Sequence, residues 1–209
     1  ESVAHVAAIA ENYELFAKKH RDCEFEINKC FSTTSEALQE GYVRLEYVEG
    51  VTLEEVLDDC VKNEEQEKFT EYFHKFCRFV KISNKKKPAN FDLIFQNIIV
   101  DENKWVAIDY EFSFDREIPA SLVIARAIHC YLADRKFRNK AKAWMISSCE
   151  ENYPEVLEHI ERSGMYENAF QFYVQGEYQA LSQIRHRIGH PAFSLEYICA
   201  RVGAGAPEI

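Results

Sequence analysis

The chain has 209 residues, a formal net charge of −10 and 47% hydrophobic residues, enough apolar material for a substantial core. Its 15 Phe and 11 Tyr supply large packing groups and argue against disorder. The acidic balance gives no support to a general nucleic-acid or anionic-membrane surface, because such surfaces need clustered Lys and Arg. The one basic cluster in the sequence, residues 85–87, is expected to be a solvated loop with at most a minor role toward an anionic acceptor.

The seven cysteines are scattered along the chain and form no C-x-x-C pair. This pattern is typical of free thiols in a reducing compartment. No apolar run approaches the roughly 18 residues that a membrane span needs, and no signal-peptide pattern is present. We therefore expect a cytoplasmic protein without a membrane span. Because the first residue is Glu and not Met, we also expect a piece of a longer protein.

Apolar residues recur at helical spacing at the start of the chain and predict an amphipathic helix from Ser2 to about Lys19. Apolar positions then alternate in two short runs, residues 25–31 and 42–48. A period of two residues is typical of strands with one buried face. We therefore predict that these runs form two antiparallel strands.

Helices dominate the prediction for the middle and the end of the chain. Thr52 is followed three residues later by Glu55, the capping-box arrangement, which predicts a helix from there to about Lys62. An aromatic stripe that begins after Glu64 predicts the strongest helix of the chain. Further helices are predicted after Pro119 and over residues 140–151, 154–162 and 166–174.

Residues 90–115 hold the most informative pattern, which predicts a loop, a strand, a turn and a second strand. Asp92 lies in the loop, and Asn97 follows five residues later at the start of the first strand. The turn falls at residues 101–104, and the second strand ends in Asp109. Polar side chains at the strand ends are therefore expected to lie close together.

An Asp, an Asn and a second Asp in this arrangement are the set that phosphoryl transfer from a nucleotide needs. Asp92 is the candidate base that orients the attacking hydroxyl and accepts its proton. Asn97 and Asp109 are the candidate ligands of a magnesium ion, which prefers oxygen donors. A hairpin with Asp and Asn at its turns is also ordinary, because these side chains bond their own backbone in loops.

The stretch resembles the catalytic segment of the protein-kinase-like superfamily, in particular the aminoglycoside and choline kinase branch. Members of that branch carry D-x-x-x-x-N, a short hairpin and then I-D-[FY]-E, and this chain has Asp92-x4-Asn97 and I-D-Y-E at residues 108–111. More closely, the segment is similar to the kinase-like domains attached to bacterial glycosyltransferases and methyltransferases of surface-polysaccharide (O-antigen) assembly. The resemblance implies an α+β, kinase-like fold, with a small-lobe remnant in residues 1–50 and a mostly helical large lobe in residues 51–209.

The resemblance also implies how a nucleotide would bind. Residues 45–53 resemble the interlobe hinge of the superfamily, where backbone groups hydrogen-bond the adenine, and this assigns Glu46 and Val48 to nucleotide binding. ATP and Mg²⁺ are the implied cofactors. Glu111 is a less direct candidate to assist the metal site.

The chain departs from the family pattern in two places. It contains no glycine-rich loop and no lysine on a following strand, which in the family precede the small-lobe helix and clamp the nucleotide. That helix normally offers a Glu to the strand lysine, and both Glu1 and Glu11 are candidates. Asn90 stands where protein kinases carry His, and we expect its side chain to brace the loop by hydrogen bonds.

Two functions are therefore open. The first is a phosphotransferase domain that acts on a hydroxyl of a glycan or small molecule and belongs to a larger polysaccharide-assembly protein. The short connection over residues 110–117 favours such an acceptor over the phospho-regulated segment of a protein kinase. The second is an inactive pseudokinase or interaction module that positions a neighbouring glycosyltransferase or methyltransferase domain. Nucleic acid is not an expected partner of either.

Overall fold

The computed structural model describes residues 2–21, 24–101, 104–110, 113–115, 117–133 and 136–161. The helices are α1 (Ser2–Lys19), α2 (Thr34–Glu40), α3 (Leu53–Lys62), α4 (Gln66–Ser83), α5 (Ala120–Ala133), α6 (Asn139–Asn152) and α7 (Pro154–Glu161), with 3₁₀ turns η1 (Phe95–Asn97) and η2 (Lys136–Arg138). The strands are β1 (Phe25–Ile27), β2 (Val51–Thr52), β3 (Ala89–Asn90), β4 (Ile98–Asp101), β5 (Lys104–Ala107) and β6 (Ser113–Phe114). This mixture of helices with a small mixed sheet is compatible with the predicted α+β class.

Most of the predicted helices are present at the expected places. α1, α3, α4, α5, α6 and α7 match the helices predicted from apolar periodicity and capping. The Thr52 hydroxyl accepts from the Glu55 N–H at 3.2 Å, and the Glu55 carboxylate accepts from the Thr52 N–H at 2.8 Å, so the capping box is confirmed. The helix predicted over residues 166–174 lies outside the described residues.

The main sheet has the strand order β1-β5-β4-β2. β4 and β5 form the predicted antiparallel hairpin, with Ile98 opposite Ala107. β2 pairs antiparallel with the outer edge of β4. A separate two-stranded ribbon of β3 and β6 pairs Asn90 with Ser113, which fixes the loop before the hairpin against the segment after it.

The prediction of two antiparallel strands over residues 25–31 and 42–48 was wrong in most of its extent. β1 covers only Phe25–Ile27 and pairs parallel with β5. The two runs meet in one antiparallel bridge between Cys30 and Leu45, with backbone hydrogen bonds on either side of it. The intervening helix α2, which begins with a second capping box, leaves only this short pairing.

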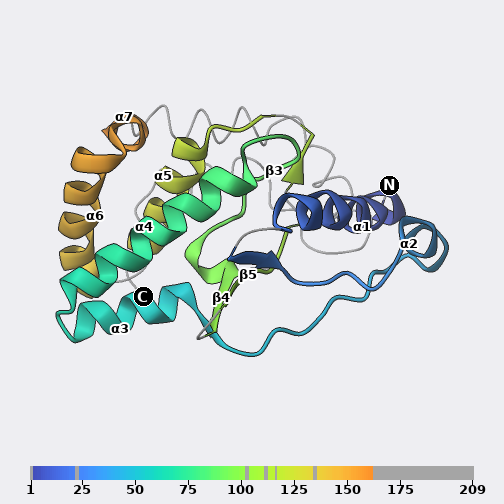
Figure 1. Ribbon diagram of the computed structural model, residues 1–209, viewed down its shortest axis with the longest axis horizontal. Helices are drawn as coiled ribbons and strands as arrows, with labels where there is room; N and C mark the ends of the chain where they lie inside the picture. Colours follow the sequence, from blue (N-terminus) through green and yellow to red (C-terminus); the bar gives the residue numbers. More distant parts are fainter. Residues whose placement is uncertain are drawn as a thin grey trace.

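α4 is the helix around which the core is built. It runs diagonally across the molecule, with α6 on one side and the main sheet on the other (Figure 1). Its apolar stripe is buried, and Phe76 packs edge to face on Phe95 with the ring centroids 4.5 Å apart. Phe79 stacks on Phe25 of β1 at 4.4 Å, which joins the helix to the sheet. Each such side chain contributes about 2 kcal/mol through its removal from water.

The C-terminal end of α1 is fastened to the segment that leads into the candidate site. The Lys19 ammonium donates to the backbone carbonyl oxygens of Ser83, Lys86 and Pro88. His20 is buried and pairs with the Ser83 hydroxyl at 2.8 Å. These contacts hold residues 83–88 in place directly before Asn90 and Asp92.

The described cysteines are free, and all of them except the half-buried Cys130 are buried. Cys30, Cys60, Cys77 and Cys149 are buried free thiols. Burial raises the pKa of Cys149 to about 12, so this thiol is inert at neutral pH. None of the described helices combines the length and apolar character that crossing a membrane requires.

Candidate functional site

Asn90 joins the loop before the hairpin to the segment after it. Its side-chain oxygen accepts from the Asp92 N–H at 2.9 Å, and its side-chain nitrogen donates to the Asp109 carbonyl at 3.4 Å. Asn84 in turn exchanges two hydrogen bonds with the Asn90 backbone, at 3.0 and 3.1 Å. Asn90 is only 2% exposed, so these bonds replace water. The prediction that Asn90 braces the loop is confirmed.

Asp92 and Asn97 are in direct contact. The Asn97 side-chain nitrogen donates both to the Asp92 carbonyl oxygen at 2.9 Å and to its carboxylate at 3.0 Å. The 3₁₀ turn η1 brings the two residues together across a spacing of five. Because the amide nitrogen of Asn97 is used in this way, its side-chain oxygen is the atom that could bind a cation.

Asp109 leaves the end of β5 in an unusual backbone conformation. Its φ of 58° lies in the left-handed region, which costs most L-residues about 1 kcal/mol and which Asp tolerates better than most. The Ile108 N–H donates to the Asn97 carbonyl at 2.9 Å, so Asp109 is one residue beyond a direct bond to Asn97. Such a conformation is often found where a side chain is aimed at a ligand.

We call residues 45–53 the hinge-like segment. A cleft of about 660 Å³ lies between this segment and Asp109. Its apolar walls include Val48, Ile99 and Ile108, and Asp109 lies at its polar side. The predicted nucleotide residues Glu46 and Val48 and the predicted metal ligand Asp109 therefore line one cleft, although they are far apart in sequence. Asp92 and Asn97 lie outside the lining residues of this cleft.

The hinge-like segment offers only part of its backbone to a ligand. The Glu46 N–H already donates to the Lys29 carbonyl at 2.8 Å, and the Glu46 carbonyl accepts from the Asn28 side chain at 3.3 Å. That carbonyl keeps a second lone pair. Among the described residues, no backbone hydrogen-bond partner engages Val48.

Asn97 and Asp109 offer side-chain oxygens, the donor atoms that magnesium prefers. In the described part of the chain, no three His, Cys, Asp or Glu side chains gather where they could hold a metal ion. One carboxylate from Asp109 and one carboxamide from Asn97 are too few to form such a group. Magnesium is commonly held by one or two protein oxygens together with substrate phosphates, which this pair would fit.

Glu111 lies outside the described residues, and so does Glu1, while Glu11 is exposed on α1.

Arg126 is a site residue that sequence reasoning missed. It extends from α5, and its guanidinium lies 2.6 Å from the Asp92 carboxylate, with both side chains 14% exposed. It also donates to the Phe91 carbonyl at 3.3 Å and lies over the Phe91 ring. A signal was present, because Arg126 is the one charged residue in the sequence of α5. A lone Arg in an apolar helix needs a buried partner.

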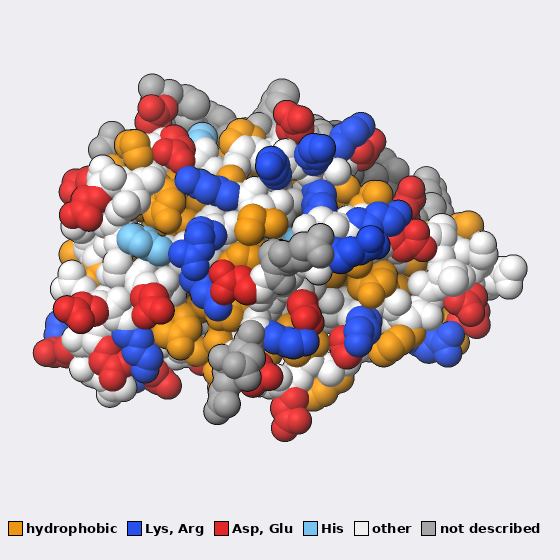
Figure 2. Space-filling view, in the orientation of Figure 1, with side chains coloured by type: hydrophobic (Ala, Val, Ile, Leu, Met, Phe, Trp, Pro, Cys, Tyr) orange, Lys and Arg blue, Asp and Glu red, His pale blue; other side chains and the backbone are white. Residues whose placement is uncertain are grey.

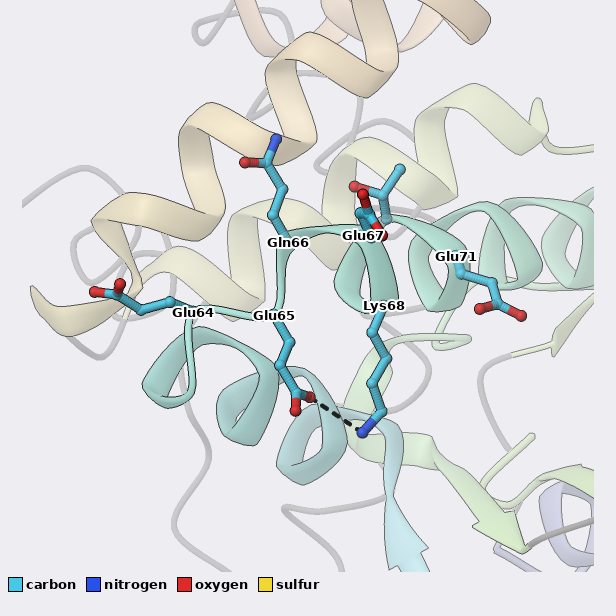
Figure 3. Close-up of a pocket in the computed structure, with 7 residues that line it drawn as sticks. Glu64, Glu65, Gln66, Glu67, Lys68 and Glu71 are labelled. Carbon is cyan, nitrogen blue, oxygen red and sulfur yellow. Dashed lines mark hydrogen bonds and ion pairs between the residues drawn. The ribbon is translucent and has the colours of Figure 1, made fainter.

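A larger concavity, of about 1110 Å³, lies at the turn between α3 and α4 (Figure 3). All the residues that line it carry polar side chains, and four of them are glutamates. Figure 3 shows Glu64, Glu65 and Glu71 pointing in different directions, with Glu65 paired to Lys68 at 3.1 Å. Carboxylates that do not converge cannot share one cation, so we assign this concavity no ligand.

Two comparisons of the sequence with known proteins found no relative. No family model matches the sequence, and no curated protein is similar to it either. The resemblance to kinase-like domains is therefore carried by the motif residues themselves.

Proposed function

We propose that this chain is the kinase-like domain of an ATP- and magnesium-dependent phosphotransferase that acts on a hydroxyl group of a glycan or another small acceptor. The observation that carries the proposal is the network around Asn90, which ties Asp92 to the segment of Asp109 while Asn97 bonds Asp92 directly. Asn90 and Asp109, 19 positions apart, thus meet between one loop and one hairpin. The cleft shared by Glu46, Val48 and Asp109 supports a nucleotide beside them.

The roles of the residues follow from their chemistry. A bound nucleoside triphosphate with magnesium would supply the phosphoryl group and the charge that neutralises it. Asp92 would orient the acceptor hydroxyl and take its proton, while the hydroxyl oxygen bonds to the γ-phosphorus, the bond from that phosphorus to the bridging oxygen breaks, and ADP leaves. Asn97 and Asp109 hold the cation through their side-chain oxygens. The hinge-like residues Glu46 and Val48 contact the base through their backbone.

A non-catalytic module is the second candidate, and Arg126 is the observation that favours it. The guanidinium occupies one oxygen of the Asp92 carboxylate, and Asn97 occupies the other. Each oxygen keeps a second lone pair, but the two contacts restrict the directions from which an acceptor hydroxyl can reach the carboxylate. An inactive domain could keep both, and would then serve to position neighbouring transferase domains.

Asp109→Asn tests the enzyme directly, in the full natural chain. The substitution removes the charge that would bind the cation, and Asn tolerates the left-handed backbone of this position as well as Asp does. We expect magnesium-dependent ADP formation from ATP, with a panel of methyl glycosides as acceptors, to fall at least about a thousandfold while the circular dichroism spectrum is unchanged.

Asp59→Asn is the matched control, because Asp59 is an exposed carboxylate on α3 that pairs with nearby Lys62 on the same helix. It should keep the wild-type rate. Turnover that survives in Asp109→Asn would refute the metal assignment. Binding of ATP and magnesium by calorimetry without any turnover in the wild type would favour the non-catalytic module, and no binding at all would remove the nucleotide from the proposal.

A further inference from the structure

Basic residues are concentrated in one part of this acidic chain. Residues 72–91 contain six Lys and Arg and no Asp or Glu, although the whole sequence has 35 acidic and 25 basic residues. Four of the six, Lys75, Arg78, Lys81 and Lys85, recur every three or four residues along α4 and just beyond it, on the side away from the buried stripe. Residues 85–87 extend the same side past the end of the helix.

The fold adds two further cations from the start of the chain. Lys18 and Arg21 are exposed at the end of α1, which Lys19 fastens to residues 83–88. Figure 2 shows Lys and Arg side chains gathered over the C-terminal half of α4 and the adjoining end of α1. We call this surface the basic band. It consists of Lys18, Arg21, Lys75, Arg78, Lys81, Lys85, Lys86 and Lys87.

Nearby acids neutralise the basic band only in part. Glu24 pairs with both Lys75 and Arg78, at 2.9 and 3.5 Å. Lys81 pairs with Glu155 at 3.7 Å, and Lys87 pairs with Asp115 at 3.2 Å. These pairs are mostly solvent-exposed and therefore weak, so an external anion can compete for the same cations.

We propose that the basic band docks the protein onto an anionic phospholipid surface. Six of its eight cations are lysines, which act as point charges suited to a diffuse layer of headgroups. The exposed aromatic residues, such as Tyr47 and Phe137, lie in other segments of the described chain, so the band lacks the stacking rings that single-stranded nucleic acids need.

The charge of the remaining surface fixes how the protein is oriented on the lipid surface. Since the whole chain carries −10, the residues outside the eight cations of the basic band carry a formal charge of −18. An anionic surface repels that remainder and attracts the band, so only one face of the molecule approaches it. Binding is therefore expected to weaken steeply as the ionic strength rises.

Co-sedimentation of the full chain with phosphatidylcholine vesicles, with and without phosphatidylglycerol, tests the proposal. The triple variant Lys81→Gln, Lys85→Gln, Lys86→Gln removes three cations of the band. Each lysine near an anionic surface is worth roughly a fivefold change in binding, so we expect the triple variant to bind about a hundredfold more weakly. The wild type should bind only the anionic vesicles.

A second triple variant controls for net charge. Lys62→Gln, Lys104→Gln, Lys140→Gln removes the same number of exposed cations from α3, β5 and α6. It should bind anionic vesicles within about threefold of the wild type. The proposal is overturned if the wild type does not bind anionic vesicles or if both triple variants lose the same amount of vesicle binding. It is also overturned if the protein binds a nucleic-acid duplex and no vesicle. These readouts need no nucleotide, so they stand apart from the proposed transferase activity.

Discussion

Asp92 is held from two sides, by the guanidinium of Arg126 and by the carboxamide of Asn97. The two contacts use different carboxylate oxygens, so they fix the orientation of the group as well as its position. An intact, partly buried ion pair of this kind changes the free energy of folding little. Removing one partner is destabilising, because it leaves the other charge buried without compensation. The stability of the loop and the chemistry of the site therefore depend on the same side chains.

A double-mutant cycle measures this pair without any assay of activity. Arg126→Met, Asp92→Ala and the combination should show a coupling of about 2 kcal/mol in the free energy of unfolding, because both side chains are largely removed from water. Urea denaturation provides the measurement. The exposed pair of Arg78 and Glu24, 3.5 Å apart, is the control and should couple by less than about 1 kcal/mol. Equal coupling in the two cycles would contradict the buried role of Arg126.

His20 makes the stability of the fold depend on pH in the acid range. Burial, and secondly the charge of Lys19, lower the pKa of His20 to about 4. Below about pH 6.5 the His20 imidazole binds a proton in the unfolded chain but stays neutral in the folded chain. The free energy of unfolding therefore falls as the pH drops from 6.5 toward 4. The full effect is about 3 kcal/mol by pH 4.

His20→Gln should abolish this dependence. We expect the stability advantage of the wild type over the variant, measured by urea denaturation, to be about 3 kcal/mol smaller at pH 4 than at pH 7. The carboxylates titrate in both proteins, so their contribution to the free energy of unfolding cancels when the two proteins are compared at each pH. A pH-independent difference would mean that His20 is protonated as easily in the folded as in the unfolded chain.

Between elements, the close contact of Gly50 with Ile99 of β4 joins the hinge-like segment to the sheet beside the cleft. Gly50 has a φ of 147° there, and a Cβ at this position would lie 2.6 Å from the Ile99 side chain. A second join is made by the buried Arg138, which forms ion pairs with Asp58 and Glu54 of α3 while lying over the Tyr131 ring of α5. Both joins lie between elements that the sequence separates.

Gly50→Ala should therefore destabilise the protein more than Gly41→Ala. The Gly50 variant meets a backbone conformation reserved for glycine and a clash with Ile99, and we expect a loss of about 3 kcal/mol or more. Gly41 is also left-handed, with a φ of 76°, but the nearest atom is an ordinary 3.8 Å away, so only about 1 kcal/mol should be lost. Urea denaturation of the two variants compares them, and equal losses would contradict the close approach at Gly50.

At the scale of the whole molecule, charge is distributed far more unevenly than the net value of −10 suggests. The sequence shows residues 85–87 as an isolated basic cluster. Folding places them beside the basic half of α4 and the end of α1, and the three groups form one surface (Figure 2). An inference from net charge alone, which gave no support to an anionic-membrane surface, therefore overlooked the band.

The local parts of the fold and of the site could be predicted from the sequence. Apolar spacing indicated α4, the capping box marked the start of α3, and two apolar runs separated by a polar turn indicated the hairpin that carries Asn97 and Asp109. These features depend on neighbours within a few residues, where helix and strand periods are visible. The capping box of Thr33 and Glu36 was equally visible and would have predicted α2.

What the tertiary structure alone decided are the contacts between distant segments. The parallel pairing of β1 with β5, the Arg126 guanidinium on Asp92 and the union of α1 with α4 in the basic band join residues that are 34 to about 80 positions apart. No local pattern encodes such partners, because they are selected by how helices and sheet pack around the shared core. The sequence by itself determined which chemical groups the protein has and which local elements carry them, and packing determined which of these groups meet.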